Sequence, residues 1–210
     1  SPAQRIHLLR PLQENTNLNL NNHTELFPEN KTILFIKKFL NKKGLFSKKF
    51  IAIGASASYS LKCWPVSHFY ELISGLLKKG WPLVLVGGKN EIETSKIEKK
   101  FIGKLHNVAG DFSYLESAEL LKQASITITN DTSISHLSEA MGTPVLVFFG
   151  PTVKEFGYAP FLNGSKIIES KEFLSCRPCS RDGRGSCKNT EFLRCLNTIS
   201  PHEVLSQIPN

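Results

Sequence analysis

The 210-residue sequence lacks the features that mark several large functional classes. Its longest apolar run, PVLVFFG at 144–150, is strand-sized, whereas a bilayer-spanning helix needs about 20 apolar residues. Neither GxGxxG nor GxxxxGKS/T occurs, which weakens a hydride-transfer function and excludes a P-loop NTPase. The start, SPAQRIHLLR, has no signal-peptide core and no initiator Met, as expected for a piece excised from a longer chain.

Acidic residues are fewer than basic ones, and most of the excess of basic residues lies in one segment. The formal net charge is +8, and residues 31–49 contain seven lysines and no acid. Ile33, Ile36 and Leu40 share one helical face, so we expect a basic amphipathic helix near 30–40. A connecting helix with a solvated face is the simplest interpretation, and attraction to an anionic membrane surface is the functional alternative. No arginine is interleaved with these lysines, so we expect no nucleic-acid partner.

Strand-like and helix-like segments alternate from residue 50 onward. The helical patterns follow Pro65 and then occupy about 91–100, 114–123, 133–141 and the stretch after Pro201. Because the strands are continuous apolar runs, the pattern predicts a parallel sheet covered on both faces, a doubly wound Rossmann-like α/β domain. The strand-like runs are 50–56, 82–88, 107–110, 124–130, 144–150 and 165–170.

Polar residues follow four of these strands. They occupy 54–62, 87–91, 110–113 and 130–136. In doubly wound domains, ligands bind outside the carboxyl ends of the strands. We therefore expect the four loops to meet at one edge of the sheet and to form a ligand site.

The richest of these loops is TNDTSIS, residues 129–135, which runs into a helix. A helix that begins near Ser133 presents unpaired amide groups and the positive end of its dipole, which suit a phosphate. Thr132 and Ser133 add hydroxyls, and Lys62 on a neighbouring loop could add a positive charge, so a diphosphate is the simplest ligand. Asp131 suits sugar hydroxyls or a helix cap. His136, one turn further on, is either a ligand contact or a structural histidine.

Glu91 follows Gly87 and Gly88 after the second strand. An acid in this position often accepts hydrogen bonds from a ribose diol in nucleotide-binding α/β folds. On spacing alone, a favourable charge in the first turn of the next helix is equally consistent.

Four of the five cysteines form the pattern C-x2-C-x7-C-x7-C, namely Cys176, Cys179, Cys187 and Cys195. In a chain without a secretion signal, such a cluster favours metal over disulfides, and a tetrahedral zinc ion needs four such ligands. A structural zinc site is therefore predicted. Free thiols, disulfides or an iron–sulfur cluster are the alternatives, and Cys63 stands apart.

Several stretches together resemble a known family: GAS…KCWP (54–65), VLVGGKNE (84–91), AGDFSYLESAELLKQAS (109–125) and TNDTSISHLSEAMGTPVLVFFGPT (129–152). With the late cysteines, they resemble the carboxyl-terminal half of family 9 glycosyltransferases, the lipopolysaccharide heptosyltransferases. The resemblance covers about residues 50–205. It implies a GT-B fold, in which this half binds ADP-heptose and the amino-terminal half binds the lipid A–core acceptor and supplies a catalytic aspartate.

The resemblance also implies roles for individual residues. Lys62 and the helix at Ser133 would hold the diphosphate, and Glu91 would hold the ribose. Phe112 would lie near the base, and Asp131 would touch the donor sugar or orient its loop. Ser58, Thr132 and His136 are the further candidate contacts. Transfer in this family inverts the sugar and requires no metal or other cofactor.

Two departures from the family pattern matter. The glycine that follows Asp-Thr in the family is Ser133 here. Residues 1–49 look like an interdomain linker, too short for a second Rossmann half, and no residue matches the catalytic aspartate. We therefore expect residues 50–210 to bind a sugar nucleotide without transferring the sugar.

Three alternatives to a heptosyltransferase remain at this point: another GT-B transferase, a nucleotide-sugar epimerase, or a non-catalytic nucleotide-sugar-binding module. For the transferase, we expect a cytoplasmic location, peripheral to the inner membrane.

Overall fold

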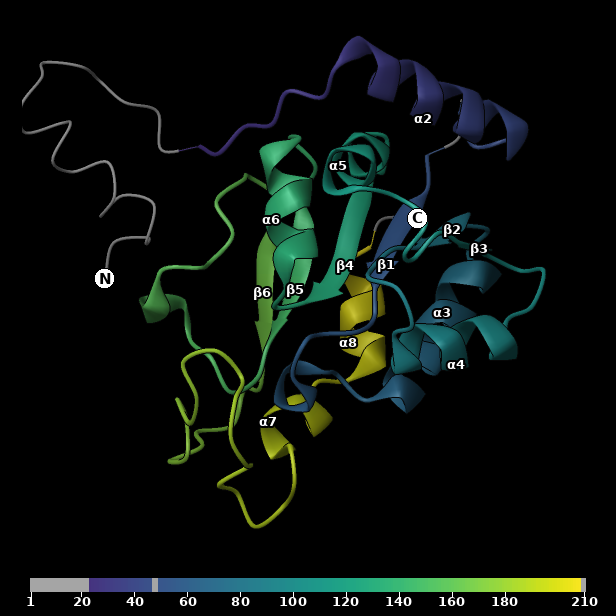
Figure 1. Cartoon of the computed structure of the whole chain (residues 1–210). Helices are drawn as coiled ribbons and strands as arrows, with labels where there is room; N and C mark the ends of the chain where they lie inside the picture. The colour runs from purple at the N-terminus through teal and green to yellow at the C-terminus, as the bar shows by residue number, and fades with distance from the viewer. Residues whose placement is uncertain (1–22, 47–48, 209–210) are drawn as a thin grey trace, which may run out of the picture.

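Three strands, at 51–54, 83–85 and 145–149, are short apolar runs that are buried throughout, as in a parallel sheet flanked by helices. The computed structural model describes residues 23–46 and 49–208. Within them lies one six-stranded parallel sheet (Figure 1). Its strands are β1 (Ile51–Gly54), β2 (Leu83–Leu85), β3 (His106–Asn107), β4 (Ile126–Asn130), β5 (Val145–Phe149) and β6 (Lys166–Glu169).

The strand order is β3-β2-β1-β4-β5-β6, that of a Rossmann-like sheet. The chain runs outward from β1 to β3, then returns to place β4 on the other side of β1. Loops that leave β1 and β4 therefore diverge to opposite faces, and a crevice opens between them. The predicted doubly wound α/β fold is confirmed.

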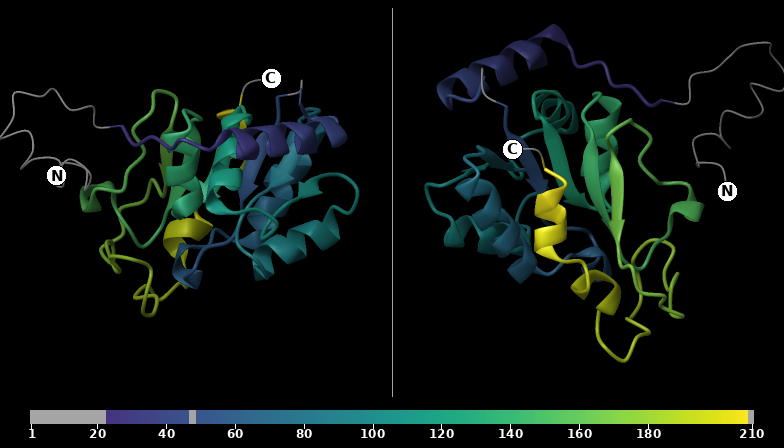
Figure 2. Two further views of the ribbon diagram at one scale, coloured as in Figure 1. Left: turned by 45° about the horizontal axis from the view of Figure 1, so that its top comes forward. Right: turned by 180° about the vertical axis from the view of Figure 1, so that it is seen from behind.

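Helices cover both faces of the sheet (Figure 2). Ile51 and Ile53 of β1 share a buried cluster with α3, α4, α7 and α8, whereas Ala52 faces the cluster of α2 and α5, against which α6 packs. The helices are α2 (Asn30–Lys42), α3 (Val66–Lys78), α4 (Ile92–Lys100), α5 (Tyr114–Lys122), α6 (Ser133–Ala140), α7 (Arg194–Asn197) and α8 (Pro201–Ser206).

The helix boundaries follow local chemistry. Pro65 immediately precedes α3, where its missing N–H costs nothing. At α5, the Ser113 hydroxyl accepts from the Glu116 amide while the Glu116 carboxylate accepts from the Ser113 amide, so the predicted capping box is present. The third predicted strand is shorter than expected and begins one residue earlier, at His106.

The predicted basic amphipathic helix is α2. Its Ile36 and Leu40 are buried against the domain, while Lys31 and Lys38 are exposed. Lys48, part of the predicted basic segment, and residues 1–22 of the predicted linker lie outside the described residues. In the part of the chain that the structure describes, no helix is both long and apolar enough to cross a membrane.

Candidate functional site

The four polar loops meet around one cavity of about 980 Å³ at the carboxyl edge of the sheet. This volume suits a ligand of nucleotide size. All eight residues that the sequence indicated as ligand contacts line it, although their roles toward a ligand stay predictions. They are Ser58, Lys62, Glu91, Phe112, Asp131, Thr132, Ser133 and His136.

The amino terminus of α6 lies at this cavity, directly after the end of β4 at Asn130. Thr132 has an extended backbone with φ of −143°, and its hydroxyl accepts a hydrogen bond from the Ile134 amide at 3.3 Å. Thr132 is thus the helix cap, and the cap role considered for Asp131 is not observed. The helix start places backbone amides and the positive dipole end beside the cavity, an arrangement that favours an anion.

Asn130 has a purely structural part in the same loop. Its side chain is fully buried, donates to the Ala55 carbonyl at 2.8 Å and accepts from the Trp64 amide at 2.9 Å. The side chain therefore ties the end of β4 to the loop after β1. This tie holds together the two loops that carry Lys62 and Asp131.

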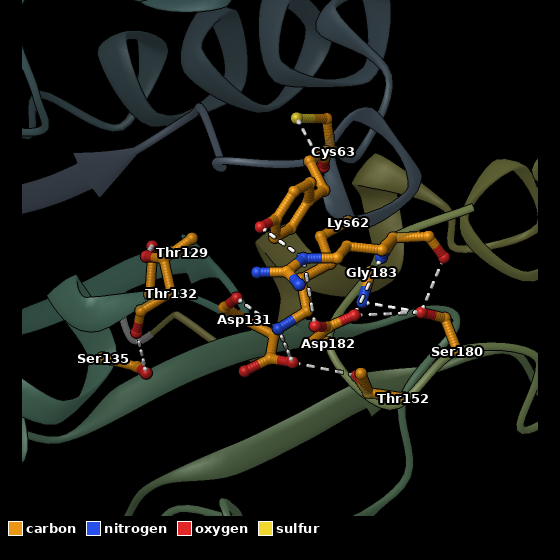
Figure 3. Close-up of polar contacts among 12 residues, drawn as sticks. Lys62, Cys63, Thr129, Asp131, Thr132, Ser135, Thr152, Ser180, Asp182 and Gly183 are labelled. Atoms are coloured by element: carbon orange, nitrogen blue, oxygen red, sulfur yellow. Dashed lines mark hydrogen bonds and ion pairs between the residues drawn. The ribbon is translucent and has the colours of Figure 1, made fainter. Parts of the chain in front are cut away.

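Lys62 and Asp131 are each other's partners. Lys62 Nζ lies 2.7 Å from Asp131 Oδ2 and also donates to the Asp131 carbonyl at 3.2 Å (Figure 3). The Thr152 hydroxyl donates to the same carboxylate at 2.9 Å. The two charged side chains are only 15% and 8% exposed. The sequence treated them as separate contacts, one for phosphate and one for sugar, whereas the fold joins them in a mostly buried ion pair.

The Glu91 side chain forms hydrogen bonds within the loop that follows β2 and with the helix after it. Its carboxylate accepts from the Gly88 amide at 2.7 Å and from the Thr94 hydroxyl at 3.1 Å. A Cβ atom at Gly87 would lie 2.3 Å from Glu91 Oε2, so a larger residue there would displace the carboxylate. Glu91 is therefore oriented by its own loop at the cavity wall.

Phe112 links the cavity to α2. Its ring meets Phe39 edge-on at 5.1 Å and Phe35 edge-on at 6.0 Å between centroids. The helix that precedes the sheet thus holds in place a residue predicted to lie near the base.

Ser133 does not have a positive φ, so its backbone conformation is one that any residue can adopt. Among the described residues, positive φ values outside glycine occur only at Asn90 and Leu193. Serine in place of the family's glycine therefore strains nothing and changes only the room beside the helix start. His136, one turn later, is exposed, and its ring lies 6.3 Å from that of Tyr158.

Sequence reasoning missed the lining residues that lie beyond the four loops and the helices that follow them, namely Tyr158, Arg181 and Asp182. Tyr158 follows the Gly-Pro-Thr stretch after β5, the next strand of the same sheet edge, and that position was a usable signal. Arg181 and Asp182 lie inside the cysteine-rich segment, residues 176–195, and no sequence pattern tied that segment to the loops of the cavity.

The cysteine-rich segment does not form the predicted zinc centre in this arrangement. Among residues 23–46 and 49–208, no three His, Cys, Asp or Glu side chains are placed to hold a metal ion. The sulfur of Cys176 accepts from Asn189 Nδ2 and that of Cys187 from the Leu193 amide. Burial raises the pKa of the Cys195 thiol to about 11. The thiols therefore have protein partners or apolar surroundings instead of common ligand geometry.

Cys63 stands apart from this cluster, as the spacing suggested. Its thiol lies 3.7 Å from the Tyr59 carbonyl and 3.9 Å from the Ala57 carbonyl. Burial raises the pKa of this thiol to about 11, so it is protonated at neutral pH and acts as a weak donor that holds the loop.

Comparison with known proteins identifies relatives of this chain. The lipooligosaccharide heptosyltransferase 2 of Haemophilus influenzae is 26% identical over 184 residues, which are 82% of this chain and 50% of that protein. The lipopolysaccharide heptosyltransferase 1 of Pseudomonas aeruginosa is 29% identical over 163 residues, 70% of this chain and 43% of that protein. The chain thus spans about half the length of the curated relatives it matches.

Solved structures share the fold. The family 9 glycosyltransferase of Veillonella parvula superposes with a TM-score of 0.82 at 18% identity, covering 99% of this chain and 59% of that one. The Escherichia coli ADP-heptose LPS heptosyltransferase II gives a TM-score of 0.67 at 20% identity, with 87% and 51% covered. The predicted membership of the GT-B fold is confirmed.

The sequence model described as glycosyltransferase family 9 (heptosyltransferase) matches residues 10–185. The match begins 44 residues before Gly54, the start of the first stretch that suggested it, and it includes α2. With a matched range of this length, on this fold, the chain belongs to glycosyltransferase family 9.

Proposed function

We propose that this chain is the donor-binding half of a glycosyltransferase that moves heptose from ADP-heptose to the inner core of lipopolysaccharide. The observation that carries the proposal is the single cavity lined by all eight predicted donor contacts. It lies at the sheet edge where doubly wound folds bind nucleotides.

Two relatives support the choice of nucleotide. The dodecameric heptosyltransferase TibC was solved with ADP-D-β-D-heptose, and it superposes on this chain with a TM-score of 0.58. The E. coli heptosyltransferase WaaC was solved with ADP and superposes with a TM-score of 0.59. We carry ADP and its heptose conjugate over to this chain as the expected ligands.

Within the cavity, each end of ADP-heptose has a suitable wall. The start of α6 favours the diphosphate, Glu91 the ribose diol, and the ring of Phe112 the base. The heptose would then reach Asp131 and His136. Donor binding of this kind needs no metal or other cofactor. The acceptor site and the catalytic aspartate belong to the other half of the family's architecture. This chain by itself is therefore expected to bind the donor without transferring the sugar. In the complete enzyme, transfer inverts the configuration of the sugar.

Calorimetry with ADP-heptose, UDP-glucose and GDP-mannose tests the proposal. We expect ADP-heptose to bind at least tenfold more tightly than the other two, a difference of about 1.4 kcal/mol. Preference for another sugar nucleotide would indicate a different GT-B transferase or an epimerase. Binding of none of them, together with a protein partner, would indicate a non-catalytic module. An incubation with ADP-heptose and lipid A–core acceptor should yield no product from this chain alone.

The outer face of α2 supports a location at the cytoplasmic surface of the inner membrane. Lys38 and Lys42 are exposed there, together with Leu34, which is 65% exposed. Exposed lysines and a partly apolar face suit an anionic lipid surface. The chain should sediment with phosphatidylglycerol vesicles and not with phosphatidylcholine vesicles, and Lys38→Glu with Lys42→Glu should abolish sedimentation. Equal sedimentation of the variant would refute the role of α2.

A further inference from the structure

The cysteine-rich segment supplies one wall of the cavity through a tight turn at residues 180–184. Gly183 has φ of +94° and lies against the short 3₁₀ helix Ser60–Lys62. A Cβ atom at Gly183 would come within 2.8 Å of Lys62 Cγ. Arg184 Nε donates to the Tyr59 hydroxyl at 2.8 Å, and its guanidinium lies 5.4 Å from the centre of the Tyr59 ring. The 180–184 turn is thus docked on the loop that carries Lys62.

The turn is also ordered internally. The Ser180 hydroxyl accepts from the Gly183 amide at 2.9 Å and donates to the Arg184 carbonyl at 2.9 Å (Figure 3). Asp182 accepts from the Arg184 amide at 3.1 Å and lies 3.3 Å from its guanidinium. Asp182 and Arg184 therefore hold the shape of the turn. Arg181, between Ser180 and Asp182, has no hydrogen bond or ion pair with any described residue, and it lines the cavity.

Some of the charged side chains around the cavity already form ion pairs, and others do not. Lys62 is paired with Asp131, and Asp182 with Arg184. Among the described residues that line the cavity, two cations have no ion pair, Lys89 and Arg181. A diphosphate brings negative charge into this cavity. Lys89 and Arg181 can bind it without breaking an existing ion pair.

Position distinguishes the two cations. Lys89 follows β2, and its backbone packs against Gly110 of the loop after β3, where a Cβ atom would lie 2.7 Å from Lys89 Cα. That is the side of Glu91 and Phe112, proposed for the ribose and base. Arg181 belongs to the turn docked beside Lys62, whose ion-pair partner Asp131 is the residue before the α6 cap, Thr132. An arginine there can present two parallel N–H donors to phosphate oxygens, in addition to the helix amides.

We propose that Arg181 is the cation that binds the diphosphate of the sugar nucleotide, and that the 180–184 turn exists to place it. This assignment rests on the proposed donor function. It gives the cysteine-rich segment a part in the site: its fold sets the position of a substrate-binding residue.

The test compares Arg181→Ala with Lys188→Ala, which removes the same charge from the same segment at a position outside the cavity lining. Calorimetry of the 210-residue chain would use inorganic pyrophosphate, ADP and adenosine. Arg181→Ala should weaken pyrophosphate and ADP about tenfold, the lower range for a charge-assisted hydrogen bond because Arg181 is exposed. Adenosine affinity should be unchanged. Arg181→Lys should recover part of the loss, and Lys188→Ala should stay within about twofold of the unsubstituted chain.

Three results would overturn the assignment. The first is an Arg181→Ala affinity for pyrophosphate equal to that of Lys188→Ala. The second is a loss that is as large for adenosine as for ADP, which would mean a general disturbance of the cavity. The third is no binding of pyrophosphate or ADP by the unsubstituted chain. If the chain instead prefers a UDP-sugar or GDP-sugar while Arg181→Ala still weakens pyrophosphate, the choice of donor fails and the role of Arg181 stands.

Discussion

Replacing Lys62 with methionine should destabilise the fold by about 3 kcal/mol. Methionine keeps an unbranched stem for packing against Gly183 and removes the charge. Asp131, whose side chain is 8% exposed, then keeps the Thr152 hydroxyl as a partner but loses its cation. Breaking a buried ion pair by removing one member costs about 3–5 kcal/mol, and the remaining hydroxyl places this case at the lower end.

The chain contains a matched control for this substitution. Lys171 and Glu203 also form an ion pair of 2.7 Å, but their side chains are 80% and 37% exposed. An exposed pair of the same length contributes about 0–1 kcal/mol, because water solvates both charges. Lys171→Met should therefore change the free energy of unfolding by no more than about 0.5 kcal/mol.

Urea unfolding followed by circular dichroism measures both variants. With a slope of roughly 2 kcal/mol/M, the Lys62→Met midpoint should fall by about 1.5 M, and the Lys171→Met midpoint by less than about 0.3 M. The double variant Lys62→Met with Asp131→Asn should regain about 2 kcal/mol relative to the sum of the single changes, since it leaves no unpaired charge. Equal midpoints for Lys62→Met and Lys171→Met would refute the reasoning that burial makes this pair stabilising.

The double variant Lys62→Met with Asp131→Asn also tests which residue binds the diphosphate. It leaves the net charge of the cavity unchanged, so its pyrophosphate affinity should stay within about threefold of the unsubstituted chain if Arg181 carries the contact. A loss as large as that of Arg181→Ala would assign the diphosphate to Lys62 instead.

Three further predictions concern other parts of the cavity and the cysteine-rich segment. Gly110→Ala should lower stability by at least about 1–2 kcal/mol in urea unfolding, because φ is +82° and the new Cβ would meet the Lys89 backbone; an unchanged midpoint would contradict this. Phe112→Ala should weaken ADP by about 1–3 kcal/mol and leave pyrophosphate unchanged in calorimetry, with Phe35→Ala, which touches Phe112 outside the cavity lining, as the control. The thiols of 176–195 share no ligand geometry, so protein purified without chelator should show five titratable thiols and no stoichiometric zinc; about one zinc per chain in metal analysis would instead support the zinc site that the cysteine spacing predicts.

The sequence determined the fold and the edge at which the site lies. Continuous apolar runs such as those of β2 and β5 are buried throughout, as expected for a parallel sheet between helices. The capping residues Ser113 and Glu116 act over three positions, so their pairing is visible in the sequence. Loops after parallel strands must leave at one edge, and for this reason the sequence alone groups eight candidate residues from four loops.

Only the tertiary structure decided which of these residues are already partnered. Lys62 and Asp131 are 69 positions apart, and nothing local in either segment indicates that the fold brings them to 2.7 Å. The arrival of Arg181 at the cavity likewise depends on a long-range contact, that of Gly183 with Lys62. Periodicity and capping are properties of neighbouring residues, so a sequence displays them directly. The pairing of charges depends on distances between separate segments, and those distances exist only once the sheet and its loops have come together.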